Sequence, residues 1–64
     1  MNDAAVTGRT AAAEHLRVGR LLEAHGDAIG AILAYREAIR EGVEPEAAEA
    51  RIRVRQLASR ALPG

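Results

Sequence analysis

The chain has 64 residues and no cysteine, which limits it to one small domain without disulfides or thiolate–metal sites. Nine basic residues balance nine acidic ones, so bulk charge gives no reason to expect binding to nucleic acid or to anionic lipid. Tyr35 is the only aromatic residue, and alanine supplies much of the apolar content. Because alanine buries little surface, we expect a thin core that oligomerisation or docking would stabilise.

The sequence lacks the usual features of a membrane-spanning or secreted protein. No apolar run approaches the roughly 20 residues of a transmembrane helix, and the N-terminus lacks the apolar stretch of a signal peptide. We therefore expect a cytoplasmic location and no membrane partner. Residues 1–9 are small and polar, which predicts a flexible arm before a helical domain at residues 10–62 and a short tail at 63–64.

The first two helices are predicted from the residues that begin and end them. Thr10 is the expected N-cap of a helix from Ala11 to about His25, with Thr7 as the alternative start. The pair Gly26-Asp27 then supplies a left-handed C-cap and the N-cap of a second helix at 28–41.

A third helix is predicted after a second short connection. Gly42 ends the second helix as Gly26 ends the first, and Pro45 suits the first turn of a helix that runs to about Leu62. Connections this short place consecutive helices side by side and antiparallel. No strand pattern competes, so the predicted fold class is all-α: an antiparallel helical hairpin with a third amphipathic helix packed across it.

Rotation by about 100° per residue separates the apolar stripes of these helices from their outer faces. The predicted core consists of the large side chains on those stripes: Leu21, Leu22, Ile32, Tyr35, Ile39, Val54 and Leu57. Leu16, Ile29, Leu33 and Ile52 are apolar residues in excess of this core. We expect a partner to cover them.

The spacing of small and large residues in the first two helices resembles a single tetratricopeptide repeat. The matching positions are Gly19, Leu22, Gly26, Asp27, Ala31, Tyr35 and Ala38, and a proline then opens the next helix. The resemblance implies a helix-turn-helix unit that packs against neighbouring helices. It also implies that the third helix takes the place of the amphipathic helix that caps arrays of such repeats.

A second family is similar to this chain. Three-helix domains of the microtubule-interacting-and-transport type share an alanine-rich first helix, the spacing of Ala31, Tyr35 and Ala38, and a basic third helix, here at 51–55. Both families bind short segments of partner proteins in grooves between helices. Either resemblance therefore implies a protein–protein interaction module that serves as a self-associating adaptor or as a small accessory subunit of a larger assembly.

The predicted partner-binding residues come from all three helices. In tetratricopeptide proteins, the face of the first helix that here carries Leu16, Arg20 and Glu23 lines the concave ligand surface. The alternative is a solvated face with one exposed leucine, which protein surfaces tolerate. The other predicted contacts are apolar residues in excess of the core and two arginines: Ile29, Leu33, Arg51, Ile52 and Arg55.

The arginines of the third helix have a second interpretation. Arg51, Arg53, Arg55 and Arg60 can bind phosphates, which makes a small nucleic-acid-binding regulator an alternative function. Nucleic-acid modules usually add a net positive charge or base-stacking aromatic residues, and this chain has neither. The same arginines can instead meet acidic residues of a protein partner or of a second copy. Glu49, four residues before Arg53, predicts an ordinary surface ion pair.

Catalysis and metal binding are not predicted. Helix geometry places no histidine near Ser59 or Thr10, and a few short helices cannot enclose a substrate of ordinary size. His15 and His25 diverge around one helix and cannot chelate one ion together. We therefore expect no enzyme activity, no cofactor, no metal and no small-molecule substrate. A non-catalytic subunit that modulates a partner enzyme is a further alternative.

Overall fold

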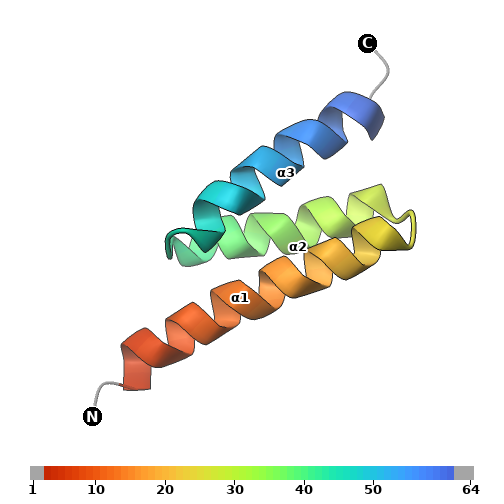
Figure 1. The fold of residues 1–64 in the computed structure, drawn as a ribbon. Coiled ribbons are helices and arrows are strands. Elements are labelled where there is room, and N and C mark those ends of the chain that lie inside the picture. The colour runs from red at the N-terminus through yellow and green to blue at the C-terminus, as the bar shows by residue number, and fades with distance from the viewer. Residues whose placement is uncertain (1–2, 62–64) are drawn as a thin grey trace.

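The fold is a three-helix arrangement in which the middle helix contacts both others. The computed structural model describes residues 3–61, and side chains at 11–60. This part of the chain is all-helical and holds no strand, with α1 at Asp3–Ala24, α2 at Ala28–Glu41 and α3 at Glu46–Ala61. Figure 1 shows α1 and α2 as an antiparallel hairpin and α3 running back along it. The predicted all-α class is confirmed.

The start of α1 differs from the prediction. The helix begins at Asp3, so Thr10 lies within it and does not cap it, and residues 3–9 belong to α1. Alanines at 4, 5 and 11–13 have the highest intrinsic helix propensity, and they outweigh the cost of about 1 kcal/mol for Gly8 inside a helix. Residues 1–2 of the predicted arm and 62–64 at the other end lie outside the described residues.

The two connections form as the sequence predicts. Gly26 has φ +81° and Gly42 has φ +70°, a left-handed backbone that glycine adopts without steric cost. The Asp27 carboxylate caps α2, because its Oδ1 accepts a hydrogen bond of 2.9 Å from the Gly30 N–H. The Gly42 N–H donates to the carbonyl of Ile39 at 3.0 Å and closes the other end of α2.

Gly19 and Tyr35 set the distance between α1 and α2. Tyr35 is fully buried, and its ring lies so close to Gly19 that a Cβ atom there would overlap ring carbons Cε1, Cδ1 and Cζ. The buried residues beside it on α2 are small, with Ala31 and Ala38 one turn on either side of the tyrosine. The hairpin is therefore specified by one large ring that fits against a bare stretch of helix backbone.

The buried stripe of α1 is rotated from the predicted one. Ala12, Leu16 and Gly19 are buried, whereas Leu21 is 49% exposed. The placement of Leu21 in the core was wrong, and so was the exposed position expected for Leu16, which is only 6% exposed. The close approach of Gly19 to Tyr35 fixes the rotation, and Leu16 lies on the same face one turn earlier.

The rest of the core follows the predicted stripes. Ala47, Ala50 and Leu57 of α3 are buried against the hairpin, and Val54 is partly buried. Leu22, Ile32 and Ile39 are partly buried beside the same cluster. None of the three helices, within the described residues, combines the length and apolar character needed to cross a bilayer.

Candidate interaction surfaces

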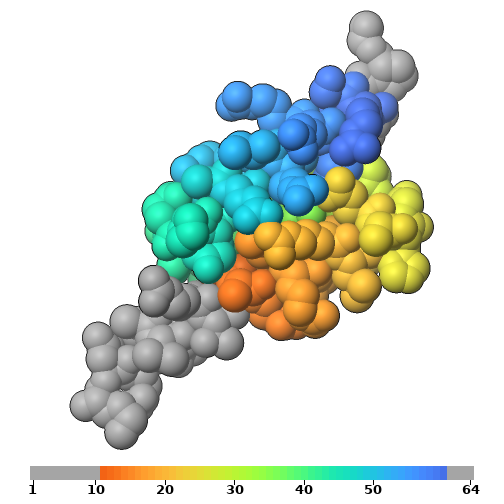
Figure 2. Space-filling view, in the orientation of Figure 1, coloured from red at the N-terminus to blue at the C-terminus, as the bar shows by residue number. Residues whose placement is uncertain are grey.

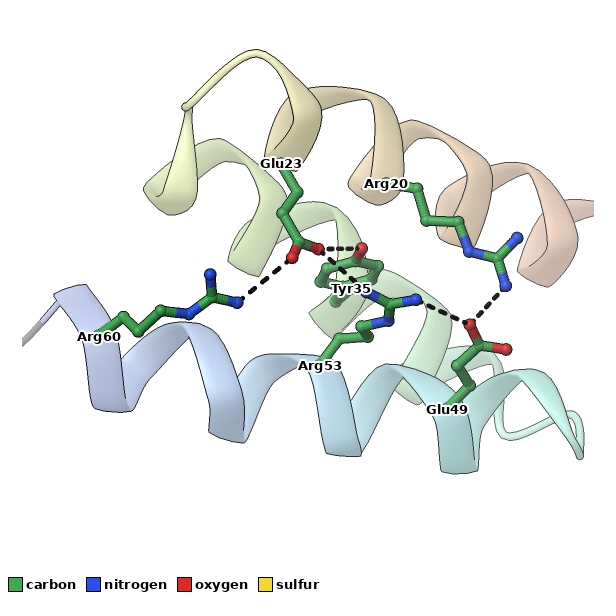
Figure 3. A network of polar contacts seen from close by, with 6 residues as sticks. All are labelled: Arg20, Glu23, Tyr35, Glu49, Arg53 and Arg60. Atoms are coloured by element: carbon green, nitrogen blue, oxygen red, sulfur yellow. Dashed lines mark hydrogen bonds and ion pairs between the residues drawn. The ribbon is translucent and has the colours of Figure 1, made fainter.

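A polar network fills the groove between α1 and α3, where these helices make few direct contacts. Figure 3 shows Glu23 of α1 above the end of the Tyr35 side chain, with arginines reaching it from α3. The Tyr35 hydroxyl donates to Glu23 Oε1 at 2.8 Å. Arg53 Nη1 lies 3.7 Å from Oε1, and Arg60 Nη2 lies 3.5 Å from Oε2. Glu23 therefore links all three helices.

A second carboxylate extends this network along the groove. Glu49 of α3 forms an ion pair with Arg20 of α1, and its Oε2 lies 3.8 Å from Arg53 Nη2. The Glu49–Arg53 pair confirms the surface pair predicted from their spacing. Arg20 and Glu23, both predicted to contact a partner, are thus engaged within the chain.

The buried phenol at the base of the groove is held in its neutral form. Burial raises the pKa of Tyr35 to about 12, and the hydrogen bond to the negatively charged Glu23 acts in the same direction. A buried tyrosine needs a partner for its hydroxyl. Glu23 serves here because it lies four residues after Gly19, on the face of α1 that the ring contacts.

The groove is open to solvent beyond these pairs. A hollow of about 400 Å³ is lined by Arg20, Glu23, Ala24, Arg53 and Arg60. Its guanidinium groups face two carboxylates that already bind them, Glu23 and Glu49. This surface is a set of mutually satisfied charges, with Arg60 the most exposed of the three arginines.

The outer side of α2 has a different character. Ile29 is 63% exposed and Leu33 is 57% exposed, and their spacing of four residues places them side by side on the helix. Arg36 and Arg40 continue the same face toward the C-terminal end. We call the stripe formed by Ile29, Leu33, Arg36 and Arg40 the α2 ridge.

An open hollow of about 830 Å³ lies beside the second half of the α2 ridge. Its lining among the described residues is Leu33, Ala34, Arg36, Glu37, Ile39 and Arg40. Glu37 Oε2 lies 3.7 Å from Arg40 Nη1, so one of the two arginines has an acidic neighbour on its own helix. The ridge and hollow together offer apolar surface followed by positive charge.

The predicted contact residues of α3 form a third surface, on the side away from the hairpin. Ile52 is exposed, and Arg51 Nη2 lies 3.3 Å from Glu44 Oε2. Arg55 is exposed, and no carboxylate among residues 11–60 lies within 4 Å of its guanidinium group. Figure 2 shows α3 seated on the hairpin with long side chains projecting from it.

The structure therefore distributes the predicted partner-binding residues over separate places. Leu16 belongs to the core, because α1 is rotated toward Tyr35. Arg20 and Glu23 meet in the groove, Ile29 and Leu33 form part of the α2 ridge, and the remaining three lie on the outer side of α3: Arg51, Ile52 and Arg55.

Comparisons with protein-family models, with curated proteins and with solved structures found no match to this chain.

Neither histidine belongs to a metal-ligand group among the residues that the structure describes. His15 Nδ1 lies 3.6 Å from Glu41 Oε2, across the hairpin, and His25 Nδ1 lies 2.8 Å from the carbonyl oxygen of Leu21. The described residues contain no group of three His, Asp or Glu side chains that could hold an ion. Sequence reasoning missed the His15–Glu41 contact, because it depends on the register of α1 against α2.

Proposed function

We propose that this chain is a protein–protein interaction module that acts as a self-associating adaptor or a small accessory subunit of a larger assembly. The observation that carries the proposal is the pair Ile29 and Leu33, which stand side by side and exposed on α2. Single exposed apolar residues need no explanation, but adjacent ones on a helix form a surface that association would bury.

The composition of the core supports this proposal. Most of the buried residues are alanines, and Tyr35 is the one large side chain fully buried among those described. Burying a large aliphatic side chain completely contributes roughly 1.5–3 kcal/mol. Two such side chains remain exposed on one face of this small chain. Docking would bury them and add their contribution to the stability of the complex.

The proposal includes the resemblance to a tetratricopeptide repeat. The fit of Gly19 against Tyr35 and the position of α3 across the hairpin support the resemblance to a tetratricopeptide repeat with a capping helix. A cytoplasmic location, a role without catalysis and the absence of a cofactor stay predictions from the sequence.

Nucleic-acid binding is the weaker alternative. Two of the four arginines of α3, Arg53 and Arg60, contact Glu23 in the groove and offer little charge to a phosphate backbone. A regulator of that kind should bind DNA or RNA with a steep dependence on salt, lost when Arg51 and Arg55 are changed to Gln.

The proposal is tested by measuring whether the full chain associates, either with itself or with another protein. We expect the tagged protein to exceed the monomer mass by light scattering, or to co-purify from its native cytosol with a protein in a defined ratio. Ile29→Glu with Leu33→Glu should abolish either result, and Leu21→Glu, at an exposed leucine of α1, is the matched control. A chain that stays monomeric and retains no partner in a defined ratio would contradict the proposal. A catalytic chain among the partners would identify the accessory-subunit form of it.

A further inference from the structure

We infer that the partner of the α2 ridge is a second copy of this chain, bound antiparallel in a two-fold symmetric dimer. This inference rests on the proposed function and names its partner. Four residues at intervals of four, three and four make the ridge, so they lie on one face of α2: Ile29, Leu33, Arg36 and Arg40. The first half of this face is apolar and the second half is basic.

The charges on the ridge select the direction of the second copy. Two ridges packed in parallel would place Arg36 against Arg36 and Arg40 against Arg40, and like charges in contact are destabilising. An antiparallel pair avoids this contact. With the two-fold axis midway between Ile29 and Leu33, each isoleucine lies opposite the leucine of the other copy.

The same register brings opposite charges together. It pairs positions whose numbers sum to 62, so Arg36 faces the turn at position 26 of the second copy, next to Asp27. Asp27 is exposed, and only its Oδ1 is engaged in the cap of α2, by the Gly30 N–H. Two symmetry-related Arg36–Asp27 pairs therefore flank the apolar contact. A two-fold interface must be self-complementary in this way.

The shape of the surface agrees with this register. The hollow beside the ridge runs from Leu33 to Arg40. In the antiparallel arrangement Leu33 and Ala34 face Ile29 and Ala28 of the second copy, so the N-terminal end of its α2 lies over the start of the hollow. Ile29 and Asp27 of one copy thus lie against the apolar and basic side chains that line the hollow of the other.

The other exposed apolar residues do not offer such a surface. Among residues 11–60, Leu21 and Ile52 each lack a second exposed large apolar side chain beside them on the helix. Ile52 is also flanked by Arg51 and Arg55, and a second copy of this face would bring arginines against arginines. The α2 ridge consists of four residues, too few to bury the roughly 1,200–2,000 Å² of surface that a stable interface buries. We therefore expect a dimer that forms and dissociates with concentration.

Sedimentation equilibrium of the full chain, from micromolar to millimolar concentration, tests the inference. The parent should pass from monomer to dimer, and Leu33→Glu should weaken the dimer by roughly 10-fold or more, because a charge replaces buried apolar surface. Leu21→Glu, which alters an exposed leucine of α1, should dimerise like the parent. Circular dichroism checks that each variant keeps its helices.

A double-mutant cycle tests the register. Arg36→Gln and Asp27→Asn should each weaken the dimer by roughly 2–5-fold, and asparagine preserves the helix cap. If the two residues pair, the double variant should be no weaker than the weaker of the two single variants. Additive losses would overturn the register.

Other outcomes overturn the dimer itself. A parent that stays monomeric at millimolar concentration contradicts it, and so does a dimer that Ile52→Glu breaks and Leu33→Glu does not. If a monomeric parent retains a different protein in a fixed ratio through Leu33, the second copy is the wrong occupant while the proposed interaction function stands.

Discussion

The two neighbours of α1 are held to it in different ways. Against α2, the contact is steric: a fully buried ring at Tyr35 lies on the bare backbone at Gly19, with alanines around it. Against α3, the contact is largely electrostatic, with Arg20 and Glu23 facing Glu49 and two arginines across a groove. The first interface tolerates no added atom, whereas the second consists of long side chains that can rearrange. Stability should therefore depend mainly on the hairpin, and the groove should adjust the position of α3.

The largest expected effect comes from two leucines on opposite sides of α1. Leu16→Ala should lower the free energy of unfolding by about 2–5 kcal/mol, because Leu16 is buried with Tyr35 and Leu57. Leu21→Ala should cost less than about 1 kcal/mol, because Leu21 is half exposed. Urea denaturation followed by circular dichroism measures both. Equal losses would show that the rotation of α1 differs from the one described.

At Gly19 we expect a smaller loss of stability, opposite in direction to the usual effect of the substitution. Glycine to alanine inside a helix normally stabilises by roughly 0.5–1 kcal/mol. Here the new Cβ would overlap the Tyr35 ring, so we expect a net loss of about 1–3 kcal/mol by denaturation.

Shortening the ring provides the control for this variant. In a Tyr35→Leu background, Gly19→Ala should lose most of its cost, since the overlapping atoms are gone. An undiminished penalty in that background would mean that the steric contact does not set the helix distance.

The base of the groove predicts a dependence on alkaline pH. The folded-state pKa of Tyr35 is about 12, above its ordinary value near 10, so the unfolded chain releases the proton first as the pH rises. Stability from this group is complete below pH ~10 and should fall by about 2 kcal/mol between pH ~10 and ~12. Tyr35→Phe should lack that decrease. An identical decrease in the phenylalanine variant would assign it to other groups.

The smallest effect is expected in the ion pairs of the groove. Arg20→Gln removes a pair between half-exposed side chains and should cost about 0.2–1 kcal/mol. The difference from the parent should shrink as salt is added, because screening weakens exposed pairs. Arg40→Gln breaks a pair within α2 alone and is the control. If Arg20→Gln lowered the free energy of unfolding by more than Gly19→Ala does, the ranking of the two interfaces would be reversed.

Sequence reasoning succeeded where the determinants are local. The caps at Asp27 and Gly42 depend on one side chain and one backbone conformation, and each has the predicted form. The buried face of α3 was also predictable, because its apolar residues keep one spacing.

The rotation of α1 was less predictable, because it depends on fit as well as hydrophobicity. Ranking residues by size selected Leu21, whereas the buried face follows Ala12 and Gly19, where little side chain stands in the way. The groove was harder still. Glu23 finds its partners 12, 30 and 37 residues away, and only the packing of α3 brings the last two within reach.

Because Tyr35 is the only aromatic residue of the chain, it is also the only near-ultraviolet chromophore among the side chains. Its ring is enclosed at the junction of α1 and α2. Near-ultraviolet circular dichroism, which reports fixed tertiary packing, should therefore report the packing around this one ring, while the far-ultraviolet signal sums over all helices. Without any label, the molecule therefore separates the loss of core packing from the loss of helix.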